Sequence, residues 1–214
     1  MIAKIIDVIF HVDKYLNILI QRYGGLVYLL LFIVIFLETG LVLAPFLPGD
    51  SLLFVAGTFA AAGSLNVYLL FFLLSLAAII GDTVNYWMGN YFGEMVFSKF
   101  IKRGYIERTR SFYKRHGKKT IILARFIPII RTFAPFIAGI GKMHYSTFLS
   151  YNIIGGIAWV AIFVFSGYFF GSLPIVKKNL TVIIFIIIST SLIPALVEYV
   201  KHRVKNKKAK LNKK

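Results

Sequence analysis

The chain has 214 residues, of which 58% are hydrophobic, and one soluble domain of this length could not hide its apolar runs from water. It contains no cysteine, which excludes disulfides, thiolate chemistry and cysteine-ligated metals. The net charge of +17 comes largely from nine Lys or Arg in residues 99–119 and eight in residues 201–214. Because both blocks flank apolar segments, we expect a polytopic membrane protein that does not bind nucleic acid.

The N-terminal segment predicts an amphipathic helix on the membrane surface. Asp7, Asp13 and Lys14 interrupt its apolar positions, so it lacks the continuous apolar core of a signal peptide. A helix with one apolar and one charged face lies in the plane of the interface. The predicted regions are an amphipathic helix at 1–22, a membrane domain at 23–200 and a basic cytoplasmic tail at 201–214.

Five apolar blocks follow along the chain, at 24–62, 65–93, 120–141, 145–171 and 180–200. Pro45 and Pro48 interrupt the first block, and Pro128 and Pro135 interrupt the third. Proline removes a backbone donor and clashes with the preceding turn, so we expect neither block to form one continuous helix. The other three are each close to, or longer than, the roughly 20 residues that cross a bilayer.

The positions of the basic blocks decide how the segment 120–141 runs. If it crossed the membrane completely, the two later spans would place the basic tail opposite the basic loop 99–119, against the positive-inside rule. If it enters and leaves on one face, both basic blocks lie in the cytoplasm. We therefore predict a re-entrant hairpin, which must be buried against protein or a wet cavity because its broken backbone needs polar partners.

The two broken blocks resemble each other. The sequences "PFLPGDSLLFVAG" and "PIIRTFAPFIAG" align Pro45 with Pro128 and Gly57 with Gly139 across one gap, and each precedes a long apolar span that ends in "YFG" or "FFG". The charge pattern makes the two hairpins open to opposite faces. The predicted fold is an all-α membrane protein, with an inverted repeat of two Pro-broken re-entrant hairpins, each followed by a transmembrane helix, plus a C-terminal transmembrane helix.

The broken blocks also hold isolated charges. Glu38 and Asp50 lie in the first and Arg125 and Arg131 in the second. Each intramembrane charge costs about 2.5–3.5 kcal/mol on insertion scales, so we expect these residues to face each other or to line a wet cavity. The structural alternative is a pair of ion bridges that lock the hairpins together.

Those residue types favour an anion site coupled to an ion. A guanidinium binds phosphate oxygens through two parallel hydrogen bonds, so two arginines inside the bilayer predict a lipid phosphate as ligand. A carboxyl that alternates its exposure can take up and release a proton, so Glu38 and Asp50 are predicted to couple transport to protons or Na⁺.

Three motifs in this order resemble the DedA family, the bacterial relatives of the VTT-domain or SNARE-associated Golgi proteins. They are "ETGLVLAPFLPGDSLLFVAG" at 38–57, "GDTVNYWMG" at 81–89 and "RFIPIIRTFAPFIAG" at 125–139. The resemblance covers roughly residues 20–200. It implies an inner-membrane lipid transporter whose members recycle undecaprenyl phosphate, while eukaryotic relatives scramble phospholipids. It further implies essential roles for Glu38, Asp50, Arg125 and Arg131.

Other residues are expected to support the site. Within the motifs these are Pro48, Gly49, Pro128 and Thr132. Asp82, Asn85 and Tyr86 share a helical face at i, i+3 and i+4, where they serve either packing or transport. Trp87 and Trp159 are expected to pack within spans. The four histidines are scattered without metal-ligand spacing, so no metal or cofactor is expected.

The residues leave other functions open. A membrane enzyme acting on lipid phosphates could use the same arginines, but no histidine or serine stands beside them in sequence as base and nucleophile. The chain is therefore expected not to be an enzyme. A phospholipid scramblase and an envelope homeostasis factor remain further alternatives. The lipid, the direction of transport and the oligomeric state are not determined by the sequence.

Overall fold

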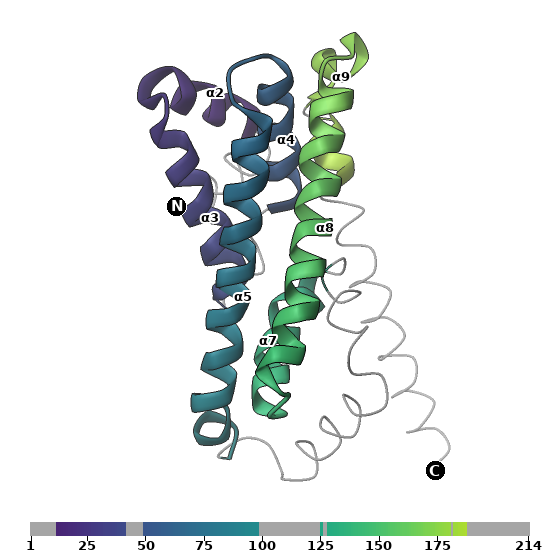
Figure 1. The fold of residues 1–214 in the computed structure, drawn as a ribbon. Helices are drawn as coiled ribbons and strands as arrows, with labels where there is room; N and C mark the ends of the chain where they lie inside the picture. The colour runs from purple at the N-terminus through teal and green to yellow at the C-terminus, as the bar shows by residue number, and fades with distance from the viewer. Residues whose placement is uncertain (1–11, 42–48, 99–124, 126–127, 181, 188–214) are drawn as a thin grey trace, which may run out of the picture.

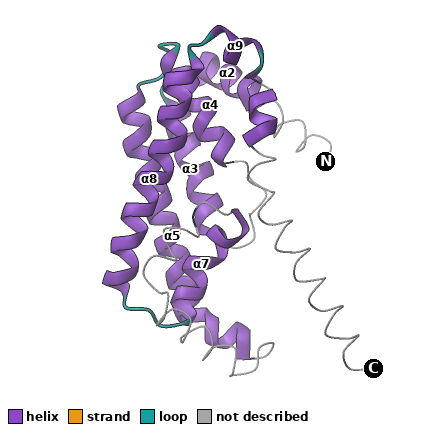
Figure 2. Ribbon diagram, turned by 90° about the vertical axis from the view of Figure 1, so that its right-hand side faces the viewer, coloured by secondary structure: helices purple, strands orange, loops and turns teal. Residues whose placement is uncertain are grey.

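The computed structural model describes residues 12–41, 49–98, 125, 128–180 and 182–187. Throughout these residues the chain forms helices joined by short turns, and no strand occurs among them (Figure 2). This confirms the all-α prediction for the described part of the chain.

The first half holds the helices α2 Val12–Tyr23, α3 Leu26–Gly40, α4 Gly49–Ala61 and α5 Val67–Ser98. The prediction that the block 24–62 is not one continuous helix is confirmed, because α3 ends at Gly40 and α4 begins only at Gly49. Pro45 and Pro48 lie outside the described residues. The 65–93 block does form a single helix, as expected, and this helix continues to Ser98.

A short turn reverses the chain between α4 and α5. Gly63 adopts a φ of 79°, in the left-handed region that glycine enters without steric cost. Asn66 then caps α5, because its side-chain oxygen accepts the backbone N–H groups of Tyr68 and Leu69 at 3.0 Å each. The local sequence thus turns the chain directly into α5, the longest of the described helices.

The second half holds α7 Pro128–Ile140, α8 Tyr145–Gly171 and α9 Pro174–Lys178, followed by helical residues at 180 and 182–187. The block 145–171 forms one helix, as predicted. The expected interruption at Pro135 is wrong, because α7 continues through it. Proline cannot donate to the carbonyl of Arg131. This turn of α7 is instead held from outside the helix. Asn85 of α5 donates to the neighbouring Thr132 carbonyl at 2.8 Å.

α4 packs closely along α8 through glycine. A Cβ added to Gly57 would lie 2.2 Å from the Val164 carbonyl oxygen, and one added to Gly167 would lie 2.0 Å from the Phe54 carbonyl oxygen. Both distances are far below van der Waals contact, so only glycine permits this approach. Figure 1 shows the two helices running in the same direction, side by side.

α7 packs along α5 in the same manner. A Cβ on Gly139 would lie 2.1 Å from the Tyr86 carbonyl oxygen, and one on Gly89 would lie 2.1 Å from the Phe136 carbonyl oxygen. The predicted repeat aligns Gly139 with Gly57, and its "YFG" and "FFG" ends align Gly89 with Gly167. In Figure 1, α5 and α7 run opposite to α4 and α8. The two glycine contacts therefore have the pairing expected of inverted repeats.

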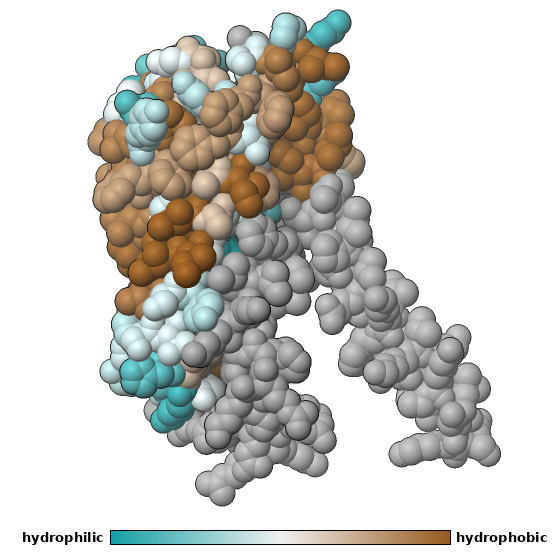
Figure 3. All heavy atoms as spheres, turned by 45° about the vertical axis from the view of Figure 1, so that its right-hand side comes forward, coloured by the Kyte–Doolittle hydropathy of each residue, from teal (hydrophilic) through white to brown (hydrophobic). Residues whose placement is uncertain are grey.

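Among the described residues, two helices are long and apolar enough to cross a membrane: Val67–Phe92 within α5, with 26 residues, and Tyr145–Gly171, with 27. At 1.5 Å per residue each extends about 40 Å, more than the roughly 30 Å of bilayer hydrocarbon. Tyr68 and Tyr91, near the two ends of the α5 span, are 75% and 68% exposed, as is common at membrane interfaces. Figure 3 shows apolar side chains gathered over the middle of one face and hydrophilic ones toward both ends.

Several predictions fall wholly or partly outside the described residues. These are the basic loop 99–119, the first part of the block 120–141, most of the block 180–200 and the tail 201–214. Of the predicted amphipathic helix at 1–22, the structure describes α2, whose Leu16 packs into the main apolar core. The membrane-surface position of this helix stays a prediction.

Candidate functional site

Arg131 of α7 lies where α3 ends and α4 begins. Its Nη1 is 2.8 Å from Asp50 Oδ1, in the first turn of α4, and its Nη2 donates to Glu38 Oε1, in the last turn of α3. The side chains of Arg131, Glu38 and Asp50 are 5%, 1% and 12% exposed. The structure thus brings three of the four predicted charges together.

Gly49, in the "PGD" segment, allows the backbone at the start of α4 to approach the Glu38 carboxylate closely. A Cβ at Gly49 would lie 1.8 Å from Glu38 Oε2, so any other residue would displace the carboxylate. Gly49 begins α4 and is buried. Gly49 therefore leaves room for the Glu38 carboxylate, and its supporting role in a site stays a prediction. Pro48 lies outside the described residues, and Pro128 begins α7, a position where its missing N–H costs nothing.

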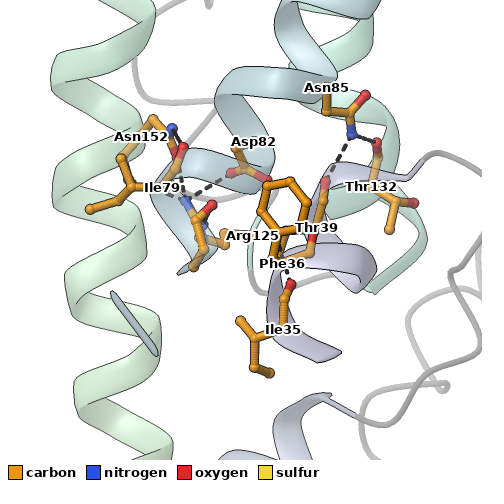
Figure 4. Close-up of polar contacts among 10 residues, drawn as sticks. Ile35, Phe36, Thr39, Ile79, Asp82, Asn85, Arg125, Thr132 and Asn152 are labelled. Carbon is orange, nitrogen blue, oxygen red and sulfur yellow. Dashed lines mark hydrogen bonds and ion pairs between the residues drawn. The ribbon is translucent and has the colours of Figure 1, made fainter. Parts of the chain in front are cut away.

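Arg125 has different partners from those expected. Its Nη1 is 2.9 Å from Asp82 Oδ2 of α5 and donates to the side-chain and backbone oxygens of Asn152 of α8 at 2.7 and 3.1 Å. Its Nη2 donates to the Ala78 carbonyl at 3.2 Å. Figure 4 shows this guanidinium between the two long helices. Arg125 therefore joins α5 to α8, and it pairs with an acid of the span instead of one from the first broken block.

Asn85 connects three helices near the same level. Its side-chain N–H groups donate to the Thr39 carbonyl of α3 at 3.1 Å and to the Thr132 carbonyl of α7 at 2.8 Å (Figure 4). Tyr86 donates to the Met143 carbonyl and stacks on the Phe148 ring, with the centroids 4.6 Å apart. Asp82 contacts Arg125, so each of the three residues on the predicted polar face of α5 has a polar partner. Whether it serves transport stays a prediction.

Trp159 of α8 belongs to the site, although the sequence indicated only packing. Its indole N–H donates to Asp50 Oδ1 at 2.8 Å, and its ring centroid lies 4.5 Å from Arg131 Cζ and 5.8 Å from Arg125 Cζ. Both separations are within the range of a cation–π contact. A sequence signal existed, because an indole N–H inside an apolar span needs a buried acceptor. Asn152 carried the same signal, as a costly amide in a span.

The electrostatic balance of the cluster is not neutral. Three carboxyls (Glu38, Asp50 and Asp82) face two guanidiniums (Arg125 and Arg131), so the fully ionised cluster has a net charge of −1. Within the part of the chain that the structure describes, the Nε atoms of both arginines and Asp82 Oδ1 are buried without a hydrogen-bond partner. Among the same described residues, Glu38 Oε2 and Asn85 Oδ1 are buried without a hydrogen-bond partner as well, so the cluster leaves both donors and acceptors unsatisfied.

Comparison with known proteins gives a family model and several relatives that this chain matches. Residues 47–169, more than half of the chain, match the family model described as the VTT domain. The chain is 50% identical over 209 residues, 95% of each chain, to Protein DedA of Escherichia coli strain K12. It is 45% identical to the uncharacterized membrane protein Rv0364 of Mycobacterium tuberculosis, covering 77% of this chain and 75% of the relative. It is 35% identical to the inner membrane protein YqjA of Escherichia coli, covering 72% of each.

The fold and the matched domain define a helical membrane protein of the VTT-domain class. Within that class, the chain belongs to the DedA family. No solved structure gives a significant match. The resemblance carried by the three sequence motifs is therefore confirmed at the level of the family.

Proposed function

We propose that this protein is a lipid transporter that moves a lipid phosphate, undecaprenyl phosphate or a related lipid, between the leaflets of the bacterial plasma membrane. The observation that carries the proposal is Arg131, which is held by two carboxylates at the point where the ends of α3 and α4 meet. Both of its terminal nitrogens already bind oxygen anions. A phosphate presents oxygens that suit the same fork.

Competition for Arg131 supplies the coupling. A phosphate can reach this guanidinium only where a carboxylate of Glu38 or Asp50 gives way. With every group ionised, the cluster has a net charge of −1. An added phosphate would therefore be repelled by the cluster. Protonation of Glu38 and Asp50 would bring it to +1, which attracts the anion. Phosphate binding and proton uptake are thereby linked, since each favours the same state.

The lengths of the broken helices support a position of this point inside the membrane. α3 has 15 residues and α4 has 13, so each extends about 20 Å and does not cross about 30 Å of hydrocarbon. We propose that α3 and α4 form one re-entrant hairpin and that α7 is the second arm of another, entering from the opposite face. Rocking of one repeat against the other would then expose Arg131 to either leaflet. The positive-inside rule places the C-terminus in the cytoplasm.

Glu38→Gln tests the coupling. The amide mimics the protonated carboxyl, so the variant is expected to fold and to bind lipid phosphate, yet to lose its dependence on the proton gradient. The measurement is movement of a labelled polyprenyl phosphate in reconstituted vesicles with and without an imposed gradient, together with a melting curve. Asp13→Asn, the same change in α2 and away from the cluster, is the control.

The outcomes separate the alternatives. An unfolded Glu38→Gln protein would favour a structural ion pair, because an unpaired buried charge costs about 3–5 kcal/mol. A stable variant with intact gradient-driven transport would remove Glu38 from the mechanism. Phosphate release in the same vesicles would indicate an enzyme, and gradient-independent lipid movement by the unaltered protein would indicate a scramblase.

A further inference from the structure

Two donors from different helices converge on one oxygen of Asp50. Arg131 Nη1, from α7, and Trp159 Nε1, from α8, each lie 2.8 Å from Asp50 Oδ1. The oxygen that they share is therefore at the centre of a small cradle of N–H groups. Nothing in the sequence spacing indicates this convergence, since Trp159 is 109 residues from Asp50.

The chemistry of Trp159 requires an acceptor in every state of the protein. An indole nitrogen is a donor only, and Trp159 is fully buried at 0% exposure, out of reach of bulk water. Leaving a buried donor unpaired is costly. If Asp50 moves away during transport, another acceptor must take the position that its oxygen leaves.

Asp50 is the most exposed of the three acids in the cluster. Its side chain is 12% exposed, against 1% for Glu38 and 4% for Asp82. It also lies in the first turn of α4, where the free backbone N–H groups of a helix favour negative charge. The position occupied by Asp50 Oδ1 thus stays favourable for an anionic oxygen whether or not Asp50 supplies it.

We propose that Trp159 is a phosphate-binding residue, whose indole N–H and Arg131 Nη1 together hold one phosphate oxygen in the position that Asp50 Oδ1 occupies in this structure. This rests on the proposed function. The Trp159 ring also contacts Arg131, whose Cζ lies 4.5 Å from the ring centroid, within the range of a cation–π contact. Asp50 and the phosphate are therefore alternative occupants of one two-donor site.

Indole NMR tests the proposal without altering the site. The chain has two tryptophans, so tryptophan labelled with ¹⁵N gives two indole N–H signals, which Trp87→Phe assigns. The protein in phosphatidylcholine nanodiscs is titrated with a polyprenyl monophosphate and, separately, with inorganic phosphate. We expect the Trp159 signal to shift saturably while that of Trp87 stays in place. A shift with both ligands would mean that the phosphate group suffices for binding. A shift with the lipid alone would mean that the polyprenyl chain of the lipid is needed too.

A matched pair of variants gives the second measurement. Trp159→Phe keeps a ring and removes the donor, and we expect it to bind the polyprenyl monophosphate about tenfold more weakly, as for loss of one charged hydrogen bond. Trp87→Phe makes the same chemical change outside the cluster and should bind like the unaltered protein.

Two results would overturn the proposal, and they are distinguishable. If labelled lipid binds and Arg131→Lys weakens that binding, while the Trp159 signal does not move, Trp159 is not a ligand and the proposed transport function survives. If the unaltered protein binds no lipid phosphate at all, both proposals fail. The NMR titration decides the matter even if Trp159→Phe does not fold.

Discussion

Replacing each site arginine by lysine should separate two roles that look identical in the sequence. Arg125 uses Nη1 for Asp82 and Asn152 and Nη2 for the Ala78 carbonyl. A lysine ammonium has a single nitrogen, which cannot contact both the partners of Nη1 and the carbonyl bound by Nη2. Arg125→Lys therefore loses at least one charged hydrogen bond, which is about 1.5–3 kcal/mol. For a chain of this size that corresponds to a fall in Tm of about 3–12 °C.

Arg131→Lys should behave differently. The ammonium still lies between Glu38 and Asp50 and keeps their attraction, so we expect a smaller loss of stability. Its single nitrogen cannot reproduce the two-pronged contact with phosphate. Binding of a lipid phosphate should therefore fall by at least about tenfold, the effect of losing one charged hydrogen bond.

Thermal melting and lipid binding, measured on the same purified protein, distinguish the two roles. Arg22→Lys, at an exposed arginine of α2, is the control and should change neither quantity. If Arg125→Lys melts within experimental error of the unaltered protein, the idea that Arg125 joins α5 to α8 is refuted. Transport assays should show most activity lost in both site variants, through instability in Arg125→Lys and through weak binding in Arg131→Lys.

Two further predictions concern the repeat and the topology. Gly57→Ala and Gly139→Ala each place a methyl group about 2 Å from a backbone oxygen of the neighbouring span, so melting curves should show each to be destabilised by about 1–3 kcal/mol. Gly25→Ala, with open space around its added Cβ, should be nearly neutral, and equal stability of all three variants would contradict the glycine contacts. In this cysteine-free chain, Lys118→Cys and Asn212→Cys should both resist labelling from outside intact cells, and labelling of both would rule out the re-entrant hairpin at 120–141.

The sequence by itself determined the features that depend on local pattern. Apolar length predicted the spans α5 and α8, and proline predicted the break between α3 and α4. The cost of charge in an apolar segment singled out Glu38, Asp50, Arg125 and Arg131 as the centre of a site. The alignment of Gly57 with Gly139 also indicated that the two halves are related. Each of these inferences needs only neighbouring residues and the free energy of burying them.

Only the tertiary structure decided which polar groups meet. The partners of Arg131 are 81 and 93 residues away, and Trp159 reaches Asp50 across 109 residues. Such contacts depend on how far one helix is shifted and rotated against another, and a rotation of one residue, about 100°, moves a side chain to a different neighbour. The glycine contacts set that register. They bring the backbones of α4 and α8, and those of α5 and α7, into direct contact.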